Sequence, residues 1–217
     1  PQPSRQGRQY KRPPLDLPPA RMLRTRDYWL CTASVALAAP AVLLFSPVIV
    51  SLGQQRGLSE GAAHLCVAVG SLGSAAGRLL MPLASDRFGR RRTDILLLWG
   101  LCGLSAAFAF ARGGWVVACY SALTFCYSGE AALLPALCTD RFGLPHAGVN
   151  YGFLALGMSA GSLGFPWLAR LWGLEDGRHW LAAGAAALGA LCLTALPETP
   201  PQPGRPAAKK AEGPGRR

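Results

Sequence analysis

Charged side chains are scarce in this chain, and acidic ones are scarcer still. Only 15% of the residues are charged and 11 are acidic, whereas 51% are hydrophobic. Soluble domains carry about 25% charged residues, so this composition favours an integral membrane protein. The three histidines form no cluster, and the seven cysteines include no Cys-x-x-Cys pair. We therefore expect the cysteines to be small packing residues, and we expect no metal, disulfide or cofactor.

The net charge of +11 is concentrated in a few short stretches. Of the 22 Lys and Arg residues, seven lie in 1–27, four in 86–92 and five after residue 200. Basic clusters that flank apolar runs indicate membrane topology rather than a nucleic-acid-binding face. Nucleic acid is therefore not an expected partner. The chain begins at Pro1 without an initiator Met, and we expect it to be a fragment of a longer protein.

Six apolar segments separate these basic clusters, each near the length of about 20 residues that crosses a bilayer as a helix. The expected spans are 29–50, 61–84, 95–111, 115–138, 148–171 and 180–196. Pro40 and Pro47 predict kinks in the first span. The ends, 1–27 and 197–217, are rich in Pro and Arg and have too few apolar residues to form a core. The sequence predicts an all-α integral membrane protein with six transmembrane helices and disordered basic ends.

Two spans carry glycines at spacings that allow another helix to approach closely. The second span contains Gly70, Gly73 and Gly77. In the fifth span, the sequence 157–161, Gly-Met-Ser-Ala-Gly, matches the Gly-x-Ser-x-Gly nucleophile elbow of some hydrolases. That elbow needs a turn between a strand and a helix, with His and acid partners. Because this stretch lies in an apolar helix, we expect a Gly-x-x-x-Gly packing face and no enzymatic activity.

A cluster of charged residues follows the second span. The sequence Asp86-Arg87-Phe88-Gly89-Arg90-Arg91 resembles the signature loop of the major facilitator superfamily, which joins the second and third helices of each six-helix half. The resemblance implies one half of such a transporter, with a gate loop formed by Asp86, Arg87, Gly89, Arg90 and Arg91. One position differs from the family pattern, because Pro82 stands where a glycine is usual.

The basic, Pro-rich start of the chain resembles the end of the family's central linker, which implies the C-terminal half. Three stretches, 127–136, 140–143 and 150–152, are similar to the oxalate/formate antiporter-like and monocarboxylate-porter-like branch. The second of them also echoes 86–89, 54 residues earlier. The resemblance implies transport of a small solute by alternating access, as a proton-coupled or exchange carrier of small organic anions. It also implies membrane lipid, a small-molecule substrate and a missing N-terminal six-helix half, or a partner half-unit, as partners.

Two observations keep other interpretations open. The sequence Pro197-Glu198-Thr199 resembles the segment after the last helix of sugar and organic-ion porters. No Lys or Arg lies near the middle of an expected span to pair with an anion. Arg78 lies towards the cytoplasmic end of its span, where it is expected to snorkel. The alternatives are therefore a sugar or organic-ion porter, or a non-transporting, partner-dependent half-unit or membrane scaffold.

Glu130 is the acidic residue that the pattern places within a span and away from its ends. A carboxylate at the centre of a span costs roughly 2.5–3.5 kcal/mol, and somewhat less towards the cytoplasmic end where Glu130 is expected, so Glu130 should face the bundle interior or a water-filled cavity. It is the first candidate for proton coupling or substrate contact, ahead of His64, Asn150 and Tyr151. The alternative is a structural Glu that bonds a neighbouring helix or pairs with a cation of the absent half.

Both termini and the 86–92 loop are predicted to face the cytoplasm, because basic residues concentrate on that side of a membrane. Single-cysteine variants of the full-length protein in sealed cells test this. A membrane-impermeant reagent added outside should leave a cysteine in 86–92 unmodified and modify one at 112–114. Labelling of the 86–92 loop from outside would rule the topology out.

Overall fold

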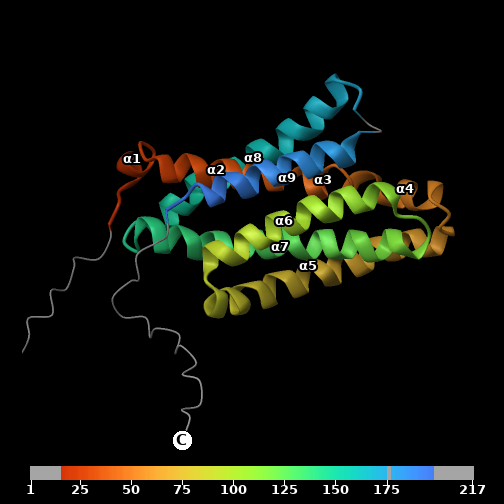
Figure 1. The fold of residues 1–217 in the computed structure, drawn as a ribbon, viewed down its shortest axis with the longest axis horizontal. Coiled ribbons are helices and arrows are strands. Elements are labelled where there is room, and N and C mark those ends of the chain that lie inside the picture. The colour runs from red at the N-terminus through yellow and green to blue at the C-terminus, as the bar shows by residue number, and fades with distance from the viewer. Residues whose placement is uncertain (1–15, 175–176, 198–217) are drawn as a thin grey trace, which may run out of the picture.

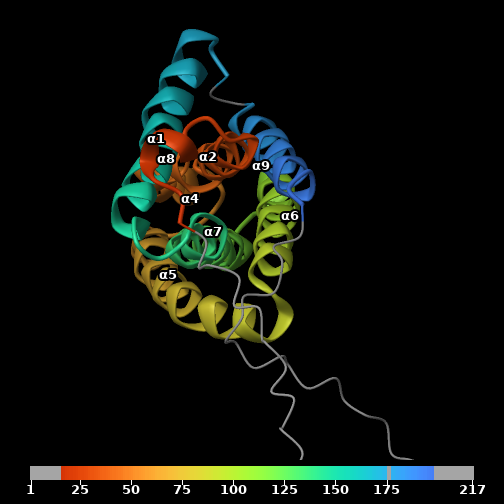
Figure 2. The same cartoon turned by 90° about the vertical axis from the view of Figure 1, so that its left-hand side faces the viewer.

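The computed structural model describes residues 16–174 and 177–197, and within these ranges it contains helices and no strand (Figure 1). The helices are α1 (Pro19–Met22), α2 (Arg26–Ala38), α3 (Pro40–Leu43), η1 (Ser46–Val48), α4 (Ile49–Gln55), α5 (Glu60–Phe88), α6 (Arg90–Phe110), α7 (Gly114–Phe142), α8 (Ala147–Leu171) and α9 (Arg178–Thr194). Viewed along the bundle, α2 and α9 lie on one side and α5 and α7 on the other (Figure 2).

Five helical segments in the described ranges are long and apolar enough to cross a membrane. They are Arg26–Gln55, α5, α6, α7 and α8. The all-α membrane fold is therefore confirmed, and five of the six predicted spans correspond to these segments. The sixth predicted span is α9, whose 17 residues make a helix about 26 Å long, somewhat shorter than the ~30 Å hydrocarbon core. The first described residues, the end of α9 and the α5–α6 turn lie at the same end of the bundle (Figure 1).

The first span is interrupted at its prolines, as the sequence predicts. Its helix stops at Ala38 and restarts at Pro40, and a short 3-10 turn follows at Ser46–Val48. Proline has no N–H to donate and its ring crowds the preceding turn, which interrupts regular helical hydrogen bonding. Pro82, by contrast, lies inside the continuous helix α5. Between the two prolines, α3 contacts α7, α8 and α9.

The segment before the first span departs from the sequence prediction. Residues 16–27 were expected to be disordered, but they form α1 and the start of α2. The backbone N–H of Leu17 donates to the Phe142 carbonyl at 2.9 Å, and Asn150 Nδ2 donates to the Leu17 carbonyl at 2.9 Å. Met22 is fully buried. Composition missed this because the bonds come from distant helix ends. The rest of the two predicted disordered segments lies outside the described residues.

Helices α5 and α7 share the most extensive helix contact in the described part of the chain, and they run parallel and in register. The Ser74 and Ser128 hydroxyls lie 2.6 Å apart, and the Thr124 hydroxyl donates to the Gly70 carbonyl at 2.8 Å. Both pairs are separated by 54 residues, which is also the spacing between the two Asp-Arg-Phe-Gly sequences. The sequence echo therefore corresponds to two equal helices lying side by side. A Cβ at Gly77 would overlap the backbone carbonyl of Phe125, so the helix contact requires glycine there.

Arg56 lies in the turn between α4 and α5, at the end of the bundle away from the termini, and it contacts both α6 and α9. Its guanidinium donates to the Phe108 carbonyl and lies 2.9 Å from His179 Nε2. Since a guanidinium has no acceptor, the imidazole nitrogen accepts. The same cation lies 5.0 Å from the Phe108 ring centroid. Burial, together with Arg112 and Arg178 nearby, lowers the pKa of Arg56. One arginine thus holds the starts or ends of three helices.

Gly77→Ala is expected to destabilise the protein by about 1–3 kcal/mol, because the added methyl group forces α5 and α7 apart. The measurement is the midpoint of thermal unfolding of the purified protein in detergent. Gly103→Ala is the matched control, since a Cβ at Gly103 in α6 meets no atom within 4 Å. Equal midpoints for the two variants would contradict the requirement for glycine at position 77.

Candidate functional site

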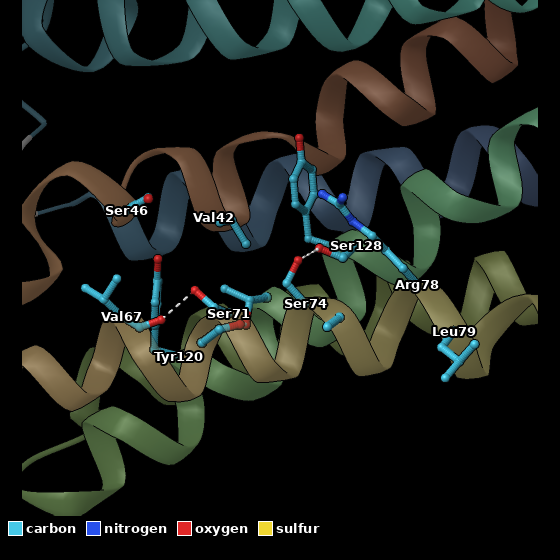
Figure 3. Close-up of a pocket in the computed structure, with 13 residues that line it drawn as sticks. Val42, Ser46, Val67, Ser71, Ser74, Arg78, Leu79, Tyr120 and Ser128 are labelled. Carbon is cyan, nitrogen blue, oxygen red and sulfur yellow. Dashed lines mark hydrogen bonds between the residues drawn. The ribbon is translucent and has the colours of Figure 1, made fainter.

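A pocket of about 670 Å³ opens on the face shared by α5, α7 and the kinked part of the first span (Figure 3). Its wall is rich in hydroxyl groups from all three elements: Ser46, Ser71, Ser74, Tyr120, Thr124, Tyr127 and Ser128. Several of them are held by the helices, since Ser74 bonds Ser128 and the Ser71 hydroxyl donates to the Val67 carbonyl at 2.8 Å. The pocket therefore presents fixed hydroxyl groups on a wall that is otherwise mostly apolar.

Arg78 is the only charged residue among those that line this pocket. Its side chain extends away from α5, on the side where Ser74 of α5 meets Ser128 of α7 (Figure 3). The sequence prediction placed it near the cytoplasmic end of a span that stops at residue 84. The helix instead continues to Phe88, ten residues or about 15 Å beyond Arg78. Arg78 thus lies in the C-terminal half of α5, and its exposed side chain lines the pocket.

Glu130 lies in the bundle interior, as predicted for a carboxyl group in a span. It is 1% exposed, and neither carboxyl oxygen has a hydrogen-bond partner among the described residues. The charged neighbour with which it interacts is Asp94 in α6, which is 3% exposed. The sequence interpretation missed Asp94 because it began the third span at residue 95. The helix begins at Arg90, so Asp94 lies one turn inside it.

The other three candidate residues do not gather around Glu130. His64 is exposed in the first turns of α5. Asn150 is fully buried at the start of α8, where it bonds the Leu17 carbonyl. Tyr151 packs beside the apolar core. Asn150 thus has a clear structural contact, and the predicted roles of these residues in coupling or substrate binding stay predictions.

The gate-loop residues form a tight turn and a charged network. Gly89 alone joins α5 to α6, with a φ of 91° that favours glycine. Arg90 pairs with Asp86 at 3.5 Å and with Asp140, at the end of α7, at 3.2 Å. Asp140 belongs to the second copy of the Asp-Arg-Phe-Gly sequence. The two copies are therefore joined by an ion pair as well as by helix packing.

Arg87 and Arg91 of the same loop have different surroundings. Arg87 is exposed. Arg91 donates to the carbonyl oxygens of Leu193 at 3.0 Å and Thr194 at 2.7 Å, the last residues of α9. A cation at the C-terminus of a helix satisfies carbonyls that have no partner within the helix. Arg91 therefore fastens the last helix to the gate loop.

The Gly-x-Ser-x-Gly sequence lies within the uninterrupted helix α8. A Cβ at Gly161 would overlap the Ala36 carbonyl of α2, and one at Gly157 would overlap Thr32. The Ser159 hydroxyl is exposed and donates to the Ala155 carbonyl in its own helix. The motif therefore packs helices, and the strand and turn of a nucleophile elbow do not occur here.

Comparison with known proteins agrees with this architecture. The family model described as Major Facilitator Superfamily matches residues 29–216. The chain belongs to the major facilitator superfamily. The match begins within α2 and covers α3 to α9, and it includes the gate loop and the pocket.

Two curated relatives are similar to this major facilitator chain at modest identity. It is 27% identical over 155 residues to the "Uncharacterized MFS-type transporter YhjX" of Escherichia coli strain K12, covering 66% of the chain and 37% of the relative. It is 29% identical over 143 residues to the "Oxalate:formate antiporter" of Oxalobacter formigenes, covering 64% of the chain and 34% of the relative. The chain thus matches about a third of the length of each relative.

Arg90→Gln is expected to slow transport by the full-length protein about fivefold with little change in abundance. The substitution removes the cation between Asp86 and Asp140, a contact worth up to about 1 kcal/mol. The measurement is the initial uptake rate per mole of reconstituted protein. Arg87→Gln is the matched control, because Arg87 is an exposed arginine of the same loop. Equal slowing by both variants would show that the loop acts through its overall charge alone.

Proposed function

We propose that this chain is the C-terminal half of a membrane carrier for small organic anions, with Arg78 as the residue that binds the anion. The observation that carries the proposal is the position of Arg78. It is the one charged residue on a pocket wall otherwise made of hydroxyl and apolar groups. No Asp or Glu among the lining residues competes for its charge.

A guanidinium in this setting suits a carboxylate. Its planar N–H groups match two carboxylate oxygens, and a bidentate pair of this kind is stronger than a hydrogen bond between neutral groups. The neighbouring hydroxyls of Tyr127 and Ser128 belong to groups that can donate further hydrogen bonds to the ligand. An organic cation would meet repulsion at Arg78, and a sugar would leave the guanidinium without an anionic partner. The pocket therefore supports an anion over the sugar and organic-ion alternatives.

Arg78 is the one cation among the described residues that line the pocket, and its single charge would balance one carboxylate group of a ligand. A monocarboxylate would be satisfied by Arg78 alone, whereas a dicarboxylate would need a second cation from elsewhere in the protein. The relative named as an oxalate:formate antiporter makes short carboxylates with one or two charges the natural ligands to test. The name of that relative supports this class and does not fix the substrate.

The open side of the pocket has a physical consequence. An anion bound at Arg78 would be exposed on that side, so a second protein surface is needed to enclose it and to move relative to this half. In folds built from two six-helix halves, the substrate lies between the halves and rocking gives alternating access. We propose that another six-helix half covers this face. Assembly of this chain with a separate partner half-unit stays the alternative.

Arg78→Gln in the full-length protein is expected to lower carboxylate uptake at least about tenfold, because a charge-assisted hydrogen bond is worth about 1.5–3 kcal/mol. Uptake of labelled short mono- and dicarboxylates is measured in proteoliposomes beside a neutral sugar and an organic cation. Arg78→Lys keeps the charge but loses the bidentate geometry. Its carboxylate uptake should therefore lie between that of the unaltered protein and that of Arg78→Gln.

Arg170→Gln is the matched control, since Arg170 is exposed near the end of α8. It should transport carboxylates like the unaltered protein. Uptake of the sugar or the organic cation but not of carboxylates would overturn the proposal, and so would carboxylate uptake that is unaffected by Arg78→Gln.

A further inference from the structure

The two ends of the anion pocket differ in character. Arg78 of α5 lies at one end, and Tyr120 of α7 lies towards the other (Figure 3). The hydrogen-bonded hydroxyls of Ser74 and Ser128 lie between them. Gly70 also lines the pocket, eight residues before Arg78 in α5, which corresponds to about 12 Å of helix. A carboxylate held at Arg78 therefore leaves room along the pocket for the rest of a ligand.

Gly70 determines where the Tyr120 ring can lie. The ring packs directly against this glycine, since a Cβ at position 70 would lie 2.7 Å from Tyr120 Cε1 and 3.0 Å from Cδ1. The Thr124 hydroxyl donates to the Gly70 carbonyl at 2.8 Å and holds α5 against α7 at this level. Because the helices are fixed so close together, the ring keeps its place only while residue 70 has no side chain.

The Tyr120 ring forms the wall at its end of the pocket. The side chain is 5% exposed, so it is packed in place. Its hydroxyl points from α7 towards the kinked part of the first span, where Val42 and Ser46 line the same pocket (Figure 3). A ring in this position limits how far a ligand bound at Arg78 can extend.

The polar groups near Tyr120 are already used as hydrogen-bond donors. The Ser71 hydroxyl donates to the Val67 carbonyl at 2.8 Å, and the Thr124 hydroxyl donates to α5 as described above. Each hydroxyl group has one hydrogen to donate. Apart from Arg78, no Lys, Arg or His is among the described residues that line the pocket. A second carboxylate at this end would lack a cation, so an uncharged group suits it better.

Apolar side chains complete the wall between the two ends. They are those of Val42, Val67, Ala75 and Leu79. An uncharged chain of several carbons would bury apolar surface against this wall, and a single methylene group in an apolar pocket changes affinity by about tenfold or more. The pocket therefore has one end for a carboxylate and a longer part for an uncharged body.

We propose that Gly70 and Tyr120 set the length of the carboxylate that this carrier accepts. This inference rests on the proposed function. The carboxylate lies at Arg78, and an uncharged body extends towards the Tyr120 ring. Gly70 is a positioning residue, because it lets the ring lie back against α5 and leaves the pocket open. A side chain at position 70 pushes the ring into the space that the body occupies.

The test measures the chain-length preference of the full-length protein in proteoliposomes. Labelled glycolate, lactate, 2-hydroxybutanoate and 2-hydroxyhexanoate are taken up into liposomes that contain unlabelled glycolate, at equal pH on both sides. Adipate is the dicarboxylate with the same number of carbons as 2-hydroxyhexanoate. Liposomes without protein correct for passive entry. The unaltered protein should take up 2-hydroxyhexanoate at least as well as glycolate and should discriminate against adipate.

Gly70→Ala should lower the ratio of 2-hydroxyhexanoate uptake to glycolate uptake at least about tenfold, because the displaced ring fills the space of one or more methylene groups. The KM for the six-carbon acid should rise while that for glycolate stays. A merely structural effect would lower the uptake of all acids alike. Gly103→Ala is the matched control, since a Cβ there meets no atom within 4 Å. It should leave the ratio unchanged.

Tyr120→Ala tests the same wall from the opposite direction and keeps the proposal testable if Gly70→Ala fails to fold. Loss of the ring lengthens the pocket, so uptake of 2-hydroxyoctanoate relative to glycolate should rise at least about tenfold. Tyr120→Phe keeps the ring and should leave the chain-length preference as it is in the unaltered protein.

The outcomes separate this inference from the proposed function. If the unaltered protein takes up none of the acids, the proposed function fails. If it takes up carboxylates but Gly70→Ala and Tyr120→Ala keep its chain-length preference, these residues do not set the length and the anion site at Arg78 stands. Uptake of adipate equal to that of 2-hydroxyhexanoate would overturn the uncharged body.

Discussion

The contact between α5 and α7 is the constraint on which the rest of this half depends. Glycines on α5 let the two parallel helices approach until side chains of one bond the backbone of the other. This register aligns the hydroxyls of Ser74 and Ser128 at the pocket wall. It also brings the two Asp-Arg-Phe-Gly ends together, where Arg90 pairs with Asp140. The pocket and the gate loop therefore both depend on the packing of α5 against α7, at different positions along the two helices.

The charges inside the span region divide into two kinds. Arg78 borders an open pocket, where a ligand can reach it. Asp94 of α6 and Glu130 of α7 are buried in the bundle and do not line the pocket. Arg78 is exposed and can be screened by water and ions, whereas the two buried carboxyl groups are screened much less.

Helices were easier to predict than their ends. Apolar runs located the spans, but polar residues continue the helices past those runs: α5 extends beyond Ala84 to Phe88, and α6 begins at Arg90. Asp94 was misplaced for this reason, since it seemed to lie outside its span. Asn150, selected as a candidate site residue, proved to bond a segment 133 residues away in sequence. No local pattern reveals such a partner.

By itself, the sequence determined the membrane fold class, the approximate spans, the proline kinks and the glycine packing faces. These follow from hydrophobicity and from local geometry, which depend on residues close together in the chain. The tertiary structure decided which charged groups face one another. The encounters of Arg78 with the pocket, of Asp94 with Glu130 and of Arg91 with the end of α9 depend on helix rotation and register. Those are set by side-chain packing between segments that are distant in the chain.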